Sequence, residues 1–118
     1  MADIYIDASG AGVPDAADRL DHLLGAGHTV VLVGDCPQAV VAALPRARRA
    51  AGIPAKPKAG SWYVTADPAI CADRPPGVRT LLVGPRVAPG PRLAPRCDAE
   101  ARDLASAVLE ILSRDAMG

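Results

Sequence analysis

The sequence contains no phenylalanine, one tryptophan and two tyrosines in 118 residues. Aromatic side chains therefore cannot dominate its interior, and we expect an aliphatic core of Val, Leu, Ile and Ala. Half of the residues are hydrophobic, at 50%. A chain of this length and composition can bury a substantial core as one domain spanning residues 1–118.

Charge of one sign is not in excess, because 13 basic and 13 acidic residues cancel. This balance argues against a nucleic-acid-binding surface. No apolar run approaches the ~18 residues of a membrane span. The first residues lack the pattern of a signal peptide, so we expect a cytoplasmic protein with no membrane partner. No CxxC pair occurs among Cys36, Cys71 and Cys97, which predicts reduced thiols rather than a zinc site or a disulfide framework.

Acidic residues follow three short apolar runs at the point where each run ends. Residues 4–6 lead into Asp7, residues 30–33 lead into Gly34 and Asp35, and residues 62–66 lead into Asp67. If these runs are parallel neighbouring strands, their carboxyl ends share one edge of the sheet. The sequence therefore predicts a cluster of carboxylates there, although Asp35 is also a good N-cap for the following helix.

The apolar runs alternate with segments of helical periodicity, which predicts an α/β domain with a parallel sheet. We expect a three-layer Rossmann-like fold with four strands in the order 2-1-3-4. The expected strands are 4–7, 29–33, 61–66 and 78–83. The expected helices are 14–24, 36–44, a second piece at 46–51 after Pro45, and 98–113. In the last of these, Leu109 is expected on the inner face. Residues 53–60 and 84–95 are expected to be loops, and residues 67–76 a turn or short helix.

The chain resembles the haloacid dehalogenase-like (HAD) superfamily. That family's first motif is an apolar strand followed by Asp-x-Asp-Gly-Thr, and the matching stretch here is Ile4-Tyr5-Ile6-Asp7-Ala8-Ser9-Gly10-Ala11. Its last motif is an apolar strand ending in Gly-Asp, a second acid a few residues on, then Gly-Val and another apolar strand. The matching stretch here is residues 62–67, then Asp73, then Gly77-Val78 and the apolar run to Val83. The family's lysine falls at Lys56 or Lys58, the only two lysines of the chain.

The resemblance implies phosphoryl transfer through an aspartyl-phosphate on Asp7. It also implies a Mg²⁺ ion held by Asp7, the Ser9 carbonyl and Asp67, since hard oxygen ligands suit this ion. Lys56 or Lys58 would offset charge on the phosphate. The implied partner is a phosphorylated small molecule or a protein.

Several departures from the family pattern point to weak or absent catalysis. Ser9 stands where the family has its general acid–base aspartate, and losing such a group costs roughly 10²–10⁴-fold in rate. Gly34 replaces the second-motif Ser or Thr, and almost no chain lies between Gly10 and Pro14 to form a cap. We therefore expect a HAD-like domain with a partly retained Mg–aspartate site and a binding or assembly role, in which homo-oligomers can form.

Two other function classes stay open. The first is an active Mg²⁺-dependent phosphohydrolase or phosphotransferase that uses Asp7. The second is a response-regulator receiver, which has similar length and topology. The receiver class fits less well, because a single acid follows the first strand and both lysines precede the third. Cys36 lies near the same edge, but no histidine has a recognisable catalytic spacing to it, so a bystander thiol is the better interpretation.

Overall fold

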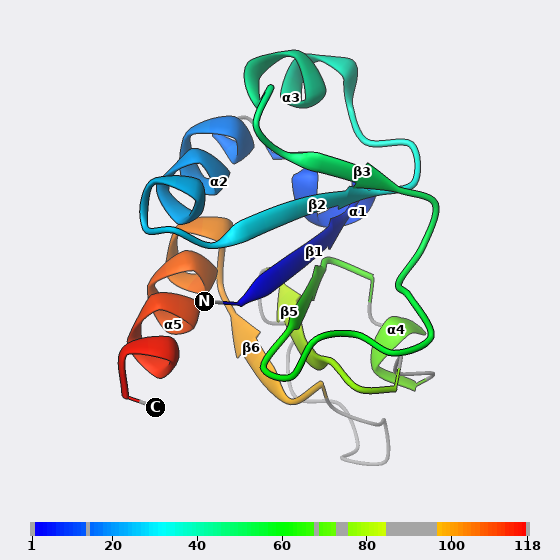
Figure 1. Cartoon of the computed structure of the whole chain (residues 1–118), viewed down its shortest axis with the longest axis vertical. Helices are drawn as coiled ribbons and strands as arrows, with labels where there is room; N and C mark the ends of the chain where they lie inside the picture. The colour runs from blue at the N-terminus through cyan, green and yellow to red at the C-terminus, as the bar shows by residue number, and fades with distance from the viewer. Residues whose placement is uncertain (1, 14, 68, 73–75, 85–96, 118) are drawn as a thin grey trace.

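The computed structural model describes residues 2–13, 15–67, 69–72, 76–84 and 97–117. The chain forms an α/β fold around one parallel sheet with the order β3-β2-β1-β4-β5-β6. The strands are β1 Asp3–Asp7, β2 Thr29–Val33, β3 Arg48–Ala50, β4 Trp62–Thr65, β5 Arg79–Val83 and β6 Ala99–Ala101. The helices are α1 Ala8–Ala11, α2 Ala16–Gly25, α3 Gln38–Ala43, α4 Ala69–Ala72 and α5 Leu104–Met117 (Figure 1).

The expected α/β fold with a parallel sheet is confirmed, but the expectation of four strands is wrong. The four expected strands form the centre of the sheet as β2-β1-β4-β5, and β3 and β6 add one strand at each edge. Residues 46–51 were expected to be helical, yet Arg48–Ala50 pair with Val31–Val33. Edge strands are short and tolerate charged side chains because one side is solvent-exposed, so they lack the apolar run that marks a central strand.

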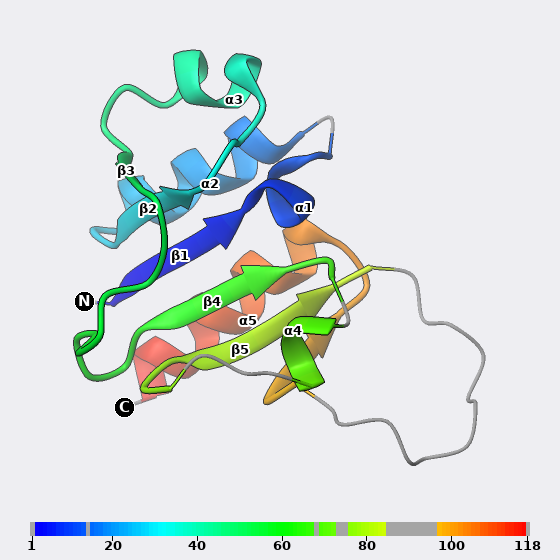
Figure 2. The ribbon, with the colours of Figure 1, turned by 90° about the vertical axis from the view of Figure 1, so that its right-hand side faces the viewer.

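One face of the sheet is covered by helices, with α2 and α5 side by side across it (Figures 1 and 2). Alternate residues of the central strands point to this face, as the period of a strand requires. Their side chains and those of the helices form one aliphatic cluster. Its strand members include Ile4, Ile6, Val30, Leu32, Trp62, Val64, Leu81 and Val83, and its helix members include Ala11, Leu20, Leu23, Val40, Leu104, Val108 and Ile111.

The opposite face has a much thinner cover. Tyr5, Val31, Val33 and Tyr63 form a second, smaller buried cluster there. The side chains that pack against this cluster come from the ends of β3 and β5, from the connecting segment and from the single-turn helix α4, and they are Ala50, Ile53, Ile70 and Val78. Figure 2 shows α4 on this side of the sheet, opposite α5. The third layer therefore consists of a coil and one helical turn in the described part of the chain.

The last helix begins later than the sequence predicted. Asp103 accepts a hydrogen bond from the backbone N–H of Ser106 at 2.8 Å, which caps the first turn of α5. Residues 99–101, expected to be helical, form β6 instead. Leu109, expected on the inner face, is 67% exposed. No helix in the described ranges is both long and apolar enough to cross a membrane.

Three other expectations fall on residues outside the described ranges: the helix start at Pro14, the second acid Asp73, and the irregular segment 84–95 beyond Gly84. Among the cysteines, Cys36 is a buried free thiol, whereas Cys97 is disulfide-bonded. The expectation of reduced thiols is therefore wrong for Cys97, because spacing along a sequence does not show which cysteines meet in space.

Candidate functional site at the carboxyl edge of the sheet

Asp7 is the last residue of β1 and lies at the carboxyl edge of the sheet, beside β4. Its carboxylate accepts four hydrogen bonds. Oδ1 accepts from the Ser9 hydroxyl at 2.6 Å and from the Gly10 backbone N–H at 3.0 Å. Oδ2 accepts from the Thr65 hydroxyl at 2.7 Å and from the Tyr63 hydroxyl at 3.0 Å. A carboxylate offers about four lone-pair positions, so Asp7 is saturated by its own chain.

Helix α1 follows Asp7 directly, and the Asp7 side chain caps it through the Gly10 N–H. Gly10 allows this short helix to lie against the sheet. A Cβ atom at Gly10 would lie 3.0 Å from Ile6 Cγ1 and 3.1 Å from the Val64 carbonyl oxygen. A side chain there would force α1 away from the sheet, since real Cβ contacts are rarely so short. Gly10 therefore serves the close packing of α1 on the sheet.

Ser9 links the same two strands from the other side of the cluster. Its hydroxyl donates to Asp7, accepts from the Ala66 backbone N–H at 3.0 Å, and lies 3.1 Å from the Thr65 hydroxyl. The contacts with Thr65 and Ala66 join the segment after β1 to the end of β4. The position that the family resemblance gives to a general acid–base thus acts here as a cross-link.

Two neighbouring groups are held in their neutral forms. Burial, and then the negative charge of Asp7, raise the pKa of Tyr63 well above its ordinary value of 10.0. Burial and the Asp7 charge likewise raise the pKa of the Cys36 thiol. Cys36 Sγ contacts the Val33 carbonyl oxygen at 3.5 Å. A buried, protonated thiol is a poor nucleophile, so Cys36 is a packing residue at this edge.

Asp67 lies at the same edge, two residues after the end of β4, and its backbone N–H donates to the Thr65 hydroxyl at 3.1 Å. Its Oδ1 accepts from the Ala69 N–H at 3.0 Å, as an N-terminal cap of α4 does. A Mg²⁺ ion between Asp7 and Asp67 would have to displace at least one of the four donors on Asp7. In the described arrangement, hydrogen-bond donors therefore occupy the Asp7 oxygens that the ion would need.

Lys56 and Lys58 lie near the opposite edge of the sheet. The Lys58 carbonyl accepts from the Ser61 N–H at 3.2 Å, just before β4 begins. Strand β4 then separates Ser61 from Thr65 by roughly 13 Å, at ~3.3 Å per residue. Pro57, next to Lys56, packs on Gly77 shortly before β5. The fold thus gathers Asp7, Ser9 and Asp67 at one edge and places both lysines toward the other.

Arg49 supplies positive charge at the carboxyl edge. An open cavity of about 450 Å³ is lined by Gly34, Asp35, Arg49, Ala50 and Ala51, between the ends of β2 and β3. The Arg49 charge also reaches Cys36, where it lowers the pKa against the larger effect of burial. The sequence marked Asp35 as an N-cap, but α3 begins after Pro37 and Asp35 instead faces this cavity.

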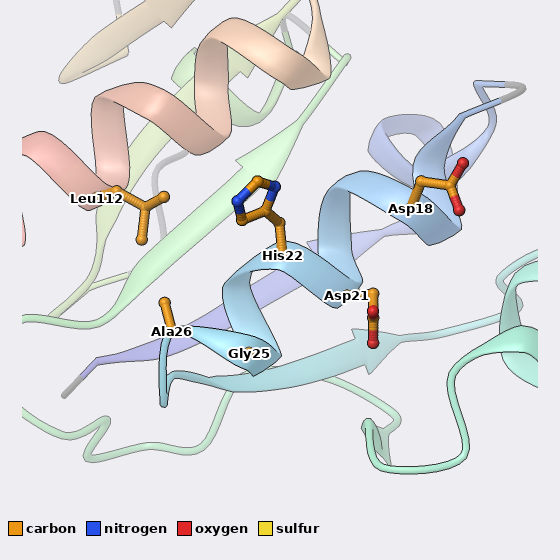
Figure 3. Close-up of a pocket in the computed structure, with 6 residues that line it drawn as sticks. All are labelled: Asp18, Asp21, His22, Gly25, Ala26 and Leu112. Atoms are coloured by element: carbon orange, nitrogen blue, oxygen red, sulfur yellow. The ribbon is translucent and has the colours of Figure 1, made fainter.

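A second open groove, of about 580 Å³, lies between α2 and α5 and is remote from this edge. Its lining residues are Asp18, Asp21, His22, Gly25, Ala26 and Leu112. Figure 3 shows His22 and Leu112 pointing into the gap between the two helices. Asp21 pairs with Arg46 at 3.4 Å on the exposed surface. The groove brings together none of the residues that the sequence singled out for chemistry.

Sequence reasoning missed Tyr63 and Thr65, the two hydroxyls from β4. A signal for them exists: they alternate with Trp62 and Val64, and a strand points alternate side chains to opposite faces. Asp7 and Tyr5 share that face on the neighbouring parallel strand. A polar residue two positions after Tyr63 should therefore lie beside Asp7, as Thr65 does.

The strand order is also that of dinucleotide-binding folds, which place a pyrophosphate at the N-terminus of the helix after the first strand. Here the Asp7 carboxylate already occupies the N-terminus of α1 through the Gly10 N–H. A pyrophosphate at that position would meet a fixed negative charge, so the shared topology does not bring a dinucleotide site with it.

Comparisons with known proteins add information about the fold. No protein-family description matches the sequence, and no curated protein matches it significantly. One crystal structure, of a protein of unknown function, is similar over 98% of this chain and 96% of its own, with a TM-score of 0.55 and 16% sequence identity. At this level of identity the similarity supports the α/β fold with its parallel sheet.

Proposed function

We propose that the chain is a HAD-like, Rossmann-like domain whose carboxyl edge is weakly catalytic or non-catalytic and serves a binding or assembly role. The family resemblance in residues 4–11 and 62–83 supports the fold assignment. One observation supports the loss of catalysis: Ser9, Gly10, Tyr63 and Thr65 donate to Asp7 and use all of its lone pairs. Asp7 then holds α1 and β4 together instead of attacking phosphorus.

The hydrogen bonds also weaken Asp7 as a nucleophile for a physical reason. Each donor stabilises the negative charge that a nucleophile must share with its target. The general acid–base of the family is replaced by Ser9, whose hydroxyl is committed to Asp7 and Ala66. The nucleophile and the general acid–base of the family mechanism are therefore both weakened.

The second candidate is a Mg²⁺-dependent phosphohydrolase or phosphotransferase. It is favoured by the position of Asp7 and Asp67 at one edge, where the Thr65 hydroxyl donates to the Asp7 carboxylate at 2.7 Å and accepts from the Asp67 backbone N–H at 3.1 Å. In this function, Mg²⁺ would displace hydroxyl donors from Asp7 and bind both carboxylates. The expected partner in either function is a phosphorylated small molecule or a protein.

The substitution Asp7→Asn separates the two functions by the response of stability to Mg²⁺. Without metal, an amide cannot accept all four hydrogen bonds, so donors are left unpaired and the free energy of unfolding falls by about 1–3 kcal/mol in either function. In the proposed function, Mg²⁺ leaves the stability of wild type and variant unchanged. In the phosphohydrolase, Mg²⁺ stabilises the wild type, and Asp7→Asn weakens this response because a carboxylate ligand is lost. Chemical denaturation with and without Mg²⁺ measures the difference.

Asp35→Asn is the matched control, because Asp35 is an exposed acid at the end of the next strand. We expect it to change stability by less than about 0.5 kcal/mol. Wild-type hydrolysis of p-nitrophenyl phosphate should equal that of Asp7→Asn, with or without Mg²⁺. A Mg²⁺-dependent gain in wild-type stability together with Mg²⁺-dependent hydrolysis, both abolished by Asp7→Asn, would establish the second candidate.

A further inference from the structure

The amino end of β4 and β5, opposite the Asp7 edge, contains two buried N–H donors that have no acceptor. The Thr80 hydroxyl, on the next residue of β5 and so on the other face of the sheet, is buried and unpartnered as well. Trp62 is fully buried and its Nε1–H makes no hydrogen bond within the described residues. The same is true of the Nε–H of Arg79, which pairs in register with Trp62 on β5. Buried donors are nearly always paired in native proteins, and an unpaired one calls for a bound water or ion.

Both unpaired donors belong to one stacked pair. The Arg79 guanidinium lies 4.0 Å from the centroid of the Trp62 ring. A second guanidinium, from Arg114 in the last turns of α5, lies 5.9 Å from the same centroid. Two positive charges therefore converge on one indole, one from β5 and one from α5.

Acidic side chains also lie at this corner. Glu110 pairs with Arg114 at 2.6 Å. Asp98 accepts from the Thr80 backbone N–H, next to Arg79, at 2.8 Å, and Asp3 lies at the amino end of the adjacent strand β1. Arg79 itself donates to the Gly60 carbonyl at 2.9 Å, and no ion pair to it is present among the described contacts. The Arg79 guanidinium is therefore the positive group at this corner without an ion-pair partner in the described contacts.

We propose that Trp62, Arg79 and Arg114 form a binding site for a phosphate-type oxyanion at this end of the sheet. A tetrahedral oxyanion presents several acceptor oxygens, which can take hydrogen bonds from the Trp62 and Arg79 donors together. Guanidinium groups match phosphate oxygens in geometry and charge. The anion enters between the two guanidinium groups as Arg79 lifts from the indole. This site is independent of Asp7 and of the function proposed above.

The single tryptophan of the chain reports directly on this site. Inorganic phosphate is titrated into the wild-type protein at constant ionic strength set with chloride, and Trp62 fluorescence and the melting temperature are followed. We expect a saturable change in fluorescence and a melting temperature that rises with phosphate concentration. Glycerol phosphate, titrated in parallel, distinguishes a site for free phosphate from a site for phosphate monoesters.

Three variants and one matched control make the test specific. Arg79→Gln and Arg114→Gln should each weaken phosphate binding by roughly tenfold or more, because each removes a charged donor. Glu110→Gln should tighten binding several-fold, since it releases Arg114 from its ion pair. Arg46→Gln is the matched control, because Arg46 is an exposed arginine on another surface, and it should bind phosphate like the wild type.

The proposal is overturned by a wild-type fluorescence that shows no saturable response to either anion. It is also overturned if both Arg79→Gln and Arg114→Gln respond like the wild type. If Asp7→Asn, which lies at the opposite edge, abolishes the response while Arg79→Gln retains it, phosphate binds at the carboxyl edge instead. Circular dichroism of each variant establishes that it is folded before its titration is compared.

Discussion

The two faces of the sheet differ in the elements that cover them, in the chemistry of their side chains, and in how well the sequence predicts them. The face under α2 and α5 is aliphatic, and its cluster contains most of the fully buried side chains. The other face carries both tyrosines of the chain and ends in the Asp7 hydrogen-bond cluster, under a coil and one helical turn. Stability and polar chemistry are thus assigned to opposite sides of the same strands. Substitutions on the two faces should therefore have unequal costs.

The largest expected difference comes from truncating a large side chain on each face. Leu20 on α2 is fully buried against the sheet, and Leu20→Ala should lower the free energy of unfolding by about 2–5 kcal/mol. Ile70 on α4 is only partly buried, and Ile70→Ala should cost about 1 kcal/mol, because solvent and coil can fill the space. Urea denaturation measures both. Equal costs would show that the coil-covered face is packed as tightly as the helical one.

A smaller but better-matched contrast lies within β2. Val30 and Val31 are consecutive, and they point to the helix-covered and coil-covered faces respectively. Val30→Ala removes two buried methyl groups from a rigid cluster and should cost about 2 kcal/mol, whereas Val31→Ala should cost about 1 kcal/mol. Because residue type, strand and substitution are shared, the difference between the two losses in unfolding free energy reports only on how each face of the sheet is covered. A greater loss in Val31→Ala would reverse the assignment of the stable face.

The smallest expected effect is a loss of stability in alkali that originates on the coil-covered face. Burial raises the pKa of both Tyr5 and Tyr63 above the ordinary value of 10.0, so the folded protein holds these protons more tightly than the unfolded chain. The stability that these two tyrosines contribute is therefore fully present below pH 10. It falls as the pH rises further, because the tyrosines ionise in the unfolded chain while they stay protonated in the folded protein. Tyr63→Phe should flatten this part of the pH–stability curve, and Arg46→Gln should not.

The central fold could be predicted from the sequence, because its strands are apolar runs with strong helical segments between them. The edge strands could not. Arg48 and Arg49 carry no apolar pattern, and β3 exists because its backbone pairs with β2. Ala99–Ala101 had the composition of a helix, and Asp103 instead starts α5 after β6 has ended. Tertiary pairing decides such short segments, and local propensity does not.

The site was predicted in part. Asp7, Ser9 and Asp67 were expected at one edge, and the parallel strands bring them there. The roles were harder to foresee, because hydrogen bonds depend on which side chains of the neighbouring strand face Asp7. Thr65 and Tyr63 do so, and they saturate the carboxylate. Lys56 and Lys58 were expected near this edge, whereas their segment lies toward the other end of the strands. A coil segment has no periodicity from which its path can be predicted.

The edge strands also bear on how this chain behaves at high concentration. Both are three residues long, and their exposed side chains include Arg48 and Arg49 at one edge and Glu100 at the other. Short, charged edges are poor templates for another strand. Aggregation of the folded protein by growth of its sheet is therefore disfavoured. Crowded or heated samples should lose solubility only once the central strands, with their long apolar runs, become exposed by unfolding.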